Sequence, residues 1–262
     1  MAATPTDWNP GAYARFRGLR LRPALDLLAQ VPDLPPGDVV DLGCGDGAVA
    51  APLRQRFPDR RLIGVDTSPA MLAQAAGYDA HVQADIADWR PDTPPALIFS
   101  NAALQWLPDH PRLFPRLAGC LAPGGCLAIQ MPRQFDAPSH RLLRDLAVAL
   151  FPDRFAVDDP VRVASPAAYW SLMAPWGSLS IWETVYLQSL PPASVGHPVR
   201  RFTESTAMRP FLARLTPAEA DRYLAAYDAA LLAPYPLLPD GGALFPFRRL
   251  FLLLTRPAAP RP

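Results

Sequence analysis

The segment Asp41–Gly47, with the sequence DLGCGDG, constrains the fold of this chain more than any other feature. It ends the short apolar run 38–42, which is typical of a buried strand, and it places glycines at positions 43, 45 and 47. Alternating glycines cost backbone entropy, so they indicate a tight turn or a ligand that approaches the backbone closely. Their spacing differs from the G-x-G-x-x-G of dinucleotide-binding folds and from the G-x-x-x-x-G-K-[ST] of P-loops. The sequence therefore predicts a strand, a turn and a helix that bind a small molecule at the turn.

Short apolar strands and helical patterns alternate through the first half of the chain. The expected strands are 38–42, 62–65, 81–84, 97–100 and 126–130, followed later by 179–187 and 250–254. Helices separate them, and the starts of two helices are marked by Ser68-Pro69 and by the capping box Thr216–Glu219. This cadence predicts βαβ units and an α/β fold with a mostly parallel seven-stranded sheet and helices on both faces.

The regular alternation of strands and helices ends after residue 131, and this change defines the expected domain organisation. We expect one domain over 1–256 with a loose tail at 257–262. Its core for cofactor binding is 31–132, and helical cap segments that cover the substrate are 1–30, 133–175 and 190–240. Parallel sheets of this kind bind ligands at the carboxyl ends of their strands, so we expect the cap to cover that edge.

Composition narrows the classes of function. The net charge is +1 and the chain has no lysine, so we expect neither a general attraction to nucleic acid or membranes nor a Schiff-base or P-loop lysine. No apolar run approaches the roughly 20 residues that cross a bilayer, and no secretory signal is visible. Three cysteines without a C-x-x-C pattern suit a reducing cytosol, which predicts a cytoplasmic protein.

The glycine segment resembles motif I of class I S-adenosylmethionine-dependent methyltransferases. Asp66 ends the second strand 23 residues after Gly43, where a carboxylate can bind ribose hydroxyls. The resemblance implies that S-adenosyl-L-methionine is the cofactor, within a Rossmann-like class I methyltransferase fold that carries a helical cap. It also implies these cofactor-binding residues: Asp41, Gly43, Gly45, Asp66, Thr67, Asp85, Ile86 and Asn101. A helix-flanking role for Asp66 and a capping role for Asp85 are the structural alternatives.

Longer strings resemble the trans-aconitate 2-methyltransferase family over residues 7–256. The most specific are Trp8-Asn9-Pro10 and Gln105–His110, QWLPDH. Ala96, Arg133-Gln134 and Ala207 depart from the family pattern. The resemblance implies an enzyme that monomethylates a small polycarboxylate, trans-aconitate first.

Carboxyl methylation makes simple chemical demands. A carboxylate is already ionised near pH 7, so the reaction requires neither a metal nor a general base. The remaining carboxylates need partners, and arginine binds them through two parallel bonds. Candidate substrate-binding residues are Trp8, Tyr13, Arg20, Arg22, Trp106, Arg209 and Arg249. Asn101, Gln105 and Trp106 are candidates for positioning, whereas His110 fits a loop or helix-capping role better than a catalytic one.

Several alternatives remain open from sequence. Each arginine could instead be an ordinary charged residue of the surface, and Trp106 could instead be part of the hydrophobic core. A methyltransferase acting on another carboxylate, such as malonyl on a carrier protein, would show a basic docking patch. C- or N-methylation of a natural product would need a base, and a non-catalytic S-adenosylmethionine-binding module would show no turnover. The expected partner is a small polycarboxylate, and the oligomeric state is open.

Overall fold

The computed structural model describes residues 17–156 and 163–258, and the side chains of residues 17–20 lie outside the description. The chain divides into two compact units. The first comprises 1–132, 163–183 and 250–262, and the second comprises 133–162 and 184–249. Two long strands supply residues to both units. The single-domain boundaries expected from sequence stay a prediction.

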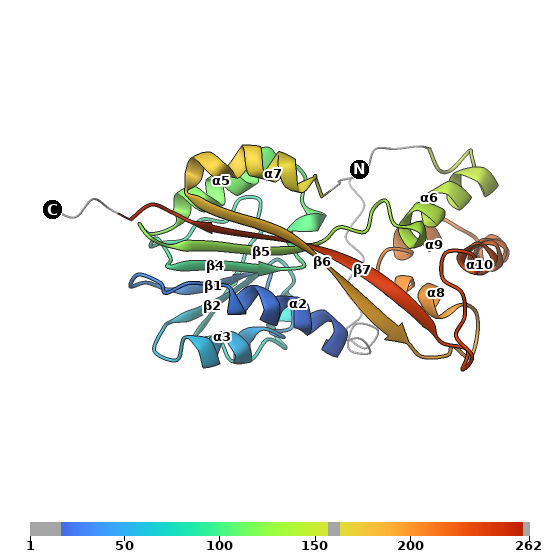
Figure 1. Cartoon of the computed structure of the whole chain (residues 1–262), viewed down its shortest axis with the longest axis horizontal. Coiled ribbons are helices and arrows are strands. Elements are labelled where there is room, and N and C mark those ends of the chain that lie inside the picture. Colours follow the sequence, from blue (N-terminus) through green and yellow to red (C-terminus); the bar gives the residue numbers. More distant parts are fainter. Residues whose placement is uncertain (1–16, 157–162, 259–262) are drawn as a thin grey trace. The chain divides into compact units, whose positions relative to one another are not determined.

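A seven-stranded sheet has the order β3-β2-β1-β4-β5-β7-β6 (Figure 1). The pairs β1–β2, β1–β4, β2–β3 and β4–β5 are parallel. The seven expected strands are confirmed, although the last two are longer than the alternating patterns indicated. Their bounds are β1 Val39–Leu42, β2 Leu62–Asp66, β3 Ala80–Gln83, β4 Leu97–Asn101, β5 Cys126–Pro132, β6 Ser178–Leu190 and β7 Ala243–Thr255.

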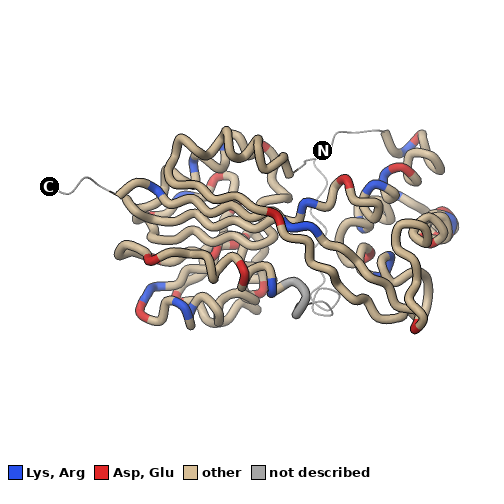
Figure 2. Tube along the Cα trace, in the orientation of Figure 1, with Lys and Arg blue, Asp and Glu red and all other residues tan. Residues whose placement is uncertain are grey.

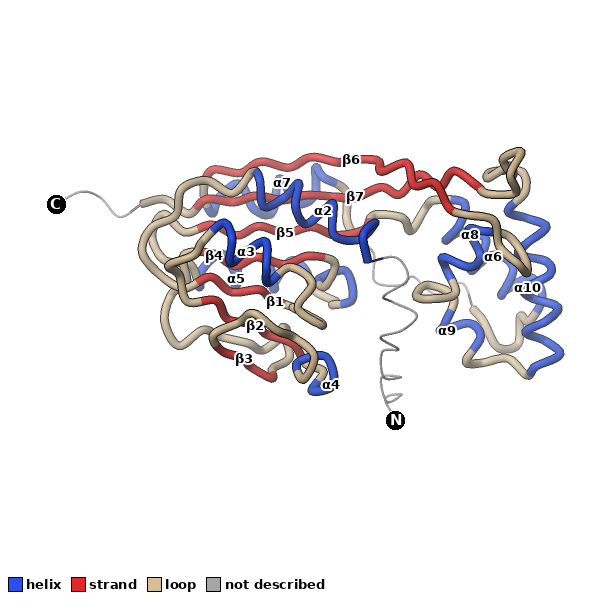
Figure 3. Tube along the Cα trace, turned by 90° about the horizontal axis from the view of Figure 1, so that it is seen from below, coloured by secondary structure: helices blue, strands red, loops and turns tan. Residues whose placement is uncertain are grey.

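Helices cover both faces of the sheet in the first unit, as expected. Helices α2 (Arg17–Ala29) and α3 (Ala50–Arg56) lie on one face, and α5 (His110–Cys120) and α7 (Pro166–Met173) lie on the other (Figures 1 and 3). Shorter helices are α4 (Pro69–Leu72), η1 (Leu104–Trp106) and η2 (Ala174–Trp176). Sequence placed α7 in the cap, but it belongs to the first unit because its buried side chains pack beside α5.

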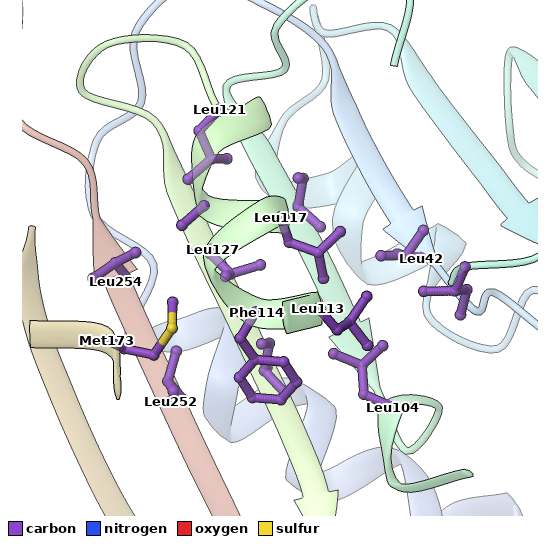
Figure 4. Close-up of a cluster of buried hydrophobic side chains, with 14 of the residues drawn as sticks. Leu42, Leu104, Leu113, Phe114, Leu117, Leu121, Leu127, Met173, Leu252 and Leu254 are labelled. Atoms are coloured by element: carbon purple, nitrogen blue, oxygen red, sulfur yellow. The ribbon is translucent and has the colours of Figure 1, made fainter. Parts of the chain in front are cut away.

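Strand β5 shows how the core separates the two faces. Leu127, Ile129 and Met131 join a cluster formed with α5 and α7 (Figure 4). Successive strand residues point to opposite faces, so Ala128 and Gln130 face the side of the sheet that carries α2. Full burial of a leucine or methionine side chain stabilises the fold by about 1.5–3 kcal/mol. The α5 face is therefore a continuous apolar layer, and polar groups of β5 lie on the other face.

The second unit is built on α6 (Pro138–Leu150), α8 (Pro198–Thr203), α9 (Arg209–Leu212) and α10 (Pro217–Leu231). Tyrosines of α10 donate to carbonyls of α6, with Tyr223 Oη 2.8 Å from Leu143 O and Tyr227 Oη 2.6 Å from Ser139 O. The predicted capping box of α10 is present. Acidic and basic residues are intermingled along the described chain (Figure 2).

Candidate active site

Four strand ends meet at one edge of the sheet in the first unit. Strands β3, β2, β1 and β4 are neighbours and run parallel, so their carboxyl ends lie side by side. The glycine loop follows β1, Asp66 ends β2, Asp85 follows β3 and Asn101 ends β4. The topology thus gathers at one edge the residues that the motif resemblance assigned to the cofactor.

The three loop glycines are glycines for different reasons. Their φ angles are +79° at Gly43, +54° at Gly45 and +81° at Gly47, in the left-handed region that other residues enter at a cost. A Cβ on Gly43 would lie 2.3 Å from the Cβ of Ala103, and one on Gly47 would lie 3.1 Å from backbone atoms of Ala75. A Cβ on Gly45 would meet nothing within 4 Å. Packing therefore requires Gly43 and Gly47, whereas Gly45 has open space above its backbone, as a ligand cradle needs.

Asp66 fastens the glycine loop to the end of β2. Its Oδ2 accepts the N–H of Gly45 at 2.9 Å, and its Oδ1 accepts the N–H of Ser68 at 2.9 Å. A carboxylate oxygen has two lone pairs, so each oxygen retains room for one more donor. The partly exposed carboxylate can thus hold the loop and two vicinal hydroxyls at once. Its role toward ribose stays a prediction, and the loop-fastening role was missed from sequence.

Asp41 is buried in β1 and receives a hydrogen bond from a tyrosine that the sequence did not single out. Tyr78 Oη donates to Asp41 Oδ2 at 2.6 Å. A Cβ on Gly64 would lie 3.1 Å from the Tyr78 ring, so a glycine in β2 gives that ring its path to Asp41. Burial raises the pKa of Asp41 to about 7, opposed by the Tyr78 hydrogen bond and reinforced by the charge of Asp66. Cationic ligands near this edge would favour the ionised carboxylate.

An arginine of α5 orders the segment after β3. Arg116 donates to the carbonyls of Ile86 at 2.6 Å, Ala87 at 2.9 Å and Trp89 at 2.6 Å. Asp85 Oδ1 accepts the N–H of Ala87 at 2.8 Å within a turn; no helix begins in this described segment, so the bond does not cap a helix. The buried Ile86 also lines the glycine loop, because its Cδ1 lies 3.3 Å from where a Cβ of Gly43 would be. Thr67, the residue that follows β2, is exposed.

The turn after β4 carries Asn101 and Gln105. Ala102 adopts φ +55°, which costs a residue with a side chain about 1–2 kcal/mol. Its N–H donates to Gln130 O at 2.9 Å, and its carbonyl accepts Gln105 Nε2 at 2.7 Å. The strained backbone conformation of Ala102 is of a kind that clusters at functional sites. Trp106 is 54% exposed, so the alternative that it belongs to the hydrophobic core is wrong.

His110 has a structural role at this turn, because both of its ring nitrogens form hydrogen bonds within the protein. Its Nε2 lies 2.9 Å from Leu104 O, and a carbonyl only accepts, so Nε2 carries the proton. Its Nδ1 then accepts from Tyr169 Oη at 2.6 Å, and the same hydroxyl accepts the N–H of Ala164 at 3.2 Å. Burial lowers the pKa of His110. A neutral, fully bonded histidine therefore anchors η1 to α7.

Two polar residues of this region were missed from sequence. Nothing in the pattern around Tyr78 distinguishes it from a surface aromatic residue. Gln130 interrupts the apolar strand Cys126–Met131, which is a signal that could have singled it out. Gln130 is fully buried, and it neighbours Asn101 in the register of β4 and β5.

The candidate substrate residues are less completely placed. Trp8 and Tyr13 lie outside the described residues, as does the side chain of Arg20 in α2. Arg22 is exposed on α2 in the first unit. In the second unit, Arg209 begins α9, and the buried Arg249 lies with its guanidinium carbon 4.2 Å from the Phe247 ring centroid. Their sharing of one substrate stays a prediction.

Two departures from the family pattern have structural explanations. Ala96 precedes β4 at the amino end of the sheet, where its N–H bonds Asp38 O at 2.9 Å, away from the candidate site. The Gln134 amide is occupied by β7, with Nε2 3.0 Å from Pro246 O and Oε1 3.0 Å from Arg248 N. The segment of Gln134 was expected to face substrate, but its amide binds the backbone.

Similarity to known proteins accords with this geometry. A methyltransferase domain family matches residues 13–175. Trans-aconitate 2-methyltransferase from Acidovorax ebreus is 44% identical over 257 residues, covering 95% of this chain and 98% of that protein. The protein of the same name from Methylobacterium nodulans is 45% identical over 258 residues, covering 95% and 98%. The chain belongs to this family. It is an S-adenosylmethionine-dependent methyltransferase.

Solved structures support the fold of this methyltransferase. YcgJ from Bacillus subtilis matches with a TM-score of 0.55 at 15% identity, covering 90% of this chain and 99% of that chain. Phosphoethanolamine N-methyltransferase 2 from Haemonchus contortus, solved with S-adenosyl-L-methionine, matches with a TM-score of 0.53 at 16% identity. That match covers 91% of this chain and 53% of the other. The expected Rossmann-like class I fold is thereby confirmed.

The described residues of the methyltransferase contain no cluster of three or more His, Cys, Asp or Glu side chains arranged to hold a metal ion. Over the same residues, every helix is too short or too polar to cross a bilayer.

Proposed function

We propose that this methyltransferase transfers a methyl group to one carboxylate of a small polycarboxylate, with trans-aconitate as the first candidate. The observation that carries the proposal is the similarity to enzymes named trans-aconitate 2-methyltransferase. It extends over 95% of this chain and 98% of the relative from Acidovorax ebreus. Such extended similarity includes the segments outside the cofactor scaffold, which are the segments expected to choose the substrate.

The edge at the ends of β1 to β4 fits the cofactor. Open space above Gly45 and the spare acceptor capacity of Asp66 suit a ligand with a close backbone contact and paired hydroxyls. Asp85, with one oxygen committed to a backbone N–H, has acceptor capacity left for an amino group, and Ile86 offers an apolar neighbour. We assign the remaining cofactor contacts to Asp41, Gly43, Thr67 and Asn101. When bound, S-adenosylmethionine supplies an already activated methyl group.

The chemistry asks this chain to bind and orient rather than to move protons. A carboxylate substrate is ionised near pH 7 and nucleophilic without a base. His110 fits that demand, because both of its ring nitrogens are occupied by structural hydrogen bonds. Holding the acceptor in place and excluding water is then the main contribution of the protein.

Arginines are suited to the carboxylates that are not methylated. Each such anion is costly to desolvate unless a partner is present. Arg249 is 4% exposed, and its guanidinium carbon lies 4.2 Å from the Phe247 ring centroid, so it is a buried cation beside an aromatic ring. Arg20, Arg22 and Arg209 are the other candidates, and the exposed Trp106, with Trp8 and Tyr13, would shield the reacting groups.

The test combines turnover with single substitutions. Labelled S-adenosylmethionine is supplied with trans-aconitate, with other di- and tricarboxylates, and with a malonylated carrier protein. We expect fastest methylation of trans-aconitate. Loss of one partner of a buried charge pair costs about 2–5 kcal/mol. At least one Arg→Ala variant at positions 20, 22, 209 and 249 should therefore lose about thirtyfold or more in kcat/KM.

Arg61→Ala provides the matched control. Arg61 is an exposed arginine whose guanidinium lies 3.6 Å from Asp38 near the amino end of the sheet. This variant should keep parental kcat/KM. If the parent prefers the carrier protein, the substrate assignment is wrong. If all four arginine variants match Arg61→Ala, the arginines do not bind substrate.

A further inference from the structure

Gln130 is a fully buried polar side chain without a hydrogen-bond partner in the described part of the chain. Its exposure is 0%, and neither Nε2 nor Oε1 has a hydrogen-bond partner among the described residues. A buried polar group left unsatisfied costs about 1–3 kcal/mol, and native structures contain few of them. An apolar residue of similar size would avoid that cost in this strand, so the amide calls for a functional reason.

The surroundings of Gln130 are those of the candidate active site. It pairs in register with Asn101, and paired residues of parallel neighbours point to the same face. Its own carbonyl binds the N–H of Ala102 in the strained turn. Asn101 Oδ1 and Gln105 Oε1 are also buried, and neither has a partner within residues 17–156 and 163–258. Three amides from β4, η1 and β5 thus share this edge with unused hydrogen-bonding capacity.

The buried atoms without partners differ in type among these three amides. Gln105 donates one Nε2 hydrogen to Ala102 O, and the buried atom that it leaves without a partner among the described residues is its oxygen, Oε1. The unused atom of Asn101 is also an oxygen. Gln130 alone of the three amides has an unused buried donor, Nε2. Acceptor oxygens suit a cationic ligand, and an N–H donor suits an anion. A donor beside acceptors is the arrangement needed where an anionic acceptor meets a cationic methyl donor.

We propose that the Gln130 amide binds the substrate carboxylate that receives the methyl group. This inference rests on the proposed function. An arginine at this place would stabilise the anion before reaction and lower its nucleophilicity, since binding that is equally strong in the ground state does not raise kcat. A neutral amide orients the oxygen with less charge stabilisation. The arginines then hold the other carboxylates, and Gln130 holds the reacting one.

Gln130→Met separates binding from structure. Methionine has a similar shape and removes the unsatisfied amide. We expect kcat/KM for trans-aconitate to fall about 10- to 100-fold, by the range for one hydrogen bond to a charged group. S-adenosylmethionine affinity, measured by calorimetry, should change less than threefold, by contrast with about tenfold for a lost bond. The Tm should rise by about 2 °C or more, as expected for about 1 kcal/mol in a chain of this size.

Gln134→Met is the matched control for stability. Gln134 is also buried, at 4% exposure, but both of its amide atoms bond the β7 backbone. The same substitution should therefore lower the Tm there. Gln130→Glu adds a charge at constant shape, so it should repel the carboxylate and lower kcat/KM further than Gln130→Met while leaving the cofactor bound.

The outcomes distinguish this inference from the proposed function. A parent enzyme that methylates no polycarboxylate overturns both. An active parent whose Gln130→Met variant keeps kcat/KM overturns the role of Gln130 alone. A variant with weakened cofactor affinity and unchanged kinetics toward trans-aconitate at saturating cofactor also overturns it, because the amide then belongs to the cofactor. A fall in Tm matching Gln134→Met would make Gln130 structural.

Discussion

Replacing Asp66 by asparagine tests the cofactor edge most directly. The carboxylate accepts Gly45 N–H and Ser68 N–H, each at 2.9 Å, and has one lone pair per oxygen left for two ribose hydroxyls. Asparagine keeps the shape but has one acceptor oxygen and presents an NH₂ group to a donor. One of the two loop bonds must therefore be lost, because a backbone N–H cannot pair with NH₂, and both ribose hydroxyls lose their bonds to a charged oxygen.

The magnitude follows from the strength of such bonds. A hydrogen bond to a charged group contributes about 1.5–3 kcal/mol net, and 1.4 kcal/mol is tenfold in affinity. We therefore expect Asp66→Asn to weaken S-adenosylmethionine binding by about 10- to 100-fold or somewhat more. Isothermal titration calorimetry on the folded variant measures this directly. The KM for trans-aconitate at saturating cofactor should change little.

Asp79→Asn is the control for losing a carboxylate that accepts a backbone N–H at a strand end without touching the cofactor edge. Asp79 Oδ2 accepts the N–H of Leu62 at 2.7 Å and a guanidinium N–H of Arg54 at 2.6 Å. It therefore caps the amino end of β2, the end opposite to Asp66. Its substitution should lower stability and leave cofactor affinity at the parental value. Equal affinities for parent and Asp66→Asn would refute the assignment of Asp66 to ribose, even if stability fell.

Three further predictions concern the same edge. Burial raises the pKa of Asp41 to about 7, so the folded state retains a proton that the unfolded chain has released; the Tm of the free enzyme should therefore fall as pH rises from about 4 to about 7 and level off above that. Affinity for the cationic cofactor should rise over the same range, by at most about tenfold per pH unit, and Asp41→Asn should flatten both profiles; a parental slope in that variant would contradict this. Gly43→Ala should unfold readily because its Cβ would lie 2.3 Å from Ala103, whereas Gly45→Ala should fold and lose cofactor affinity, as thermal melts and calorimetry would show. Activity should survive chelator, and kcat at saturating cofactor should stay flat above the last carboxyl pKa of the substrate, since a carboxylate nucleophile needs neither metal nor base; restoration of lost activity by one divalent ion would refute it.

The sequence alone determined the succession of strands along the chain and led to the expectation that the cofactor binds at their carboxyl ends. Hydrophobic runs of strand length, prolines at helix starts and the glycine loop are local signals, because they reflect the dihedral angles and burial that each short segment requires. Ser68-Pro69 and the Thr216–Glu219 capping box are confirmed as helix starts for this reason. The Asp at the end of the second strand follows from the same local logic.

Only the tertiary structure decided which polar groups are committed and which are not. The sequence around Gly43 does not show that the Ala103 side chain leaves no room for a Cβ at position 43. Nor does it show that Tyr78 reaches Asp41 by passing over Gly64. Hydrogen bonds between residues far apart in the chain depend on how strands and helices are packed, and periodicity does not encode that packing. Gln130 and Gln134 have the same side chain four residues apart, yet both amide atoms of Gln134 are bonded and those of Gln130 have no partner among the described residues. That difference arises because Gln134 lies against the backbone of β7, whereas Gln130 lies beside Asn101 on the face of the sheet that carries α2.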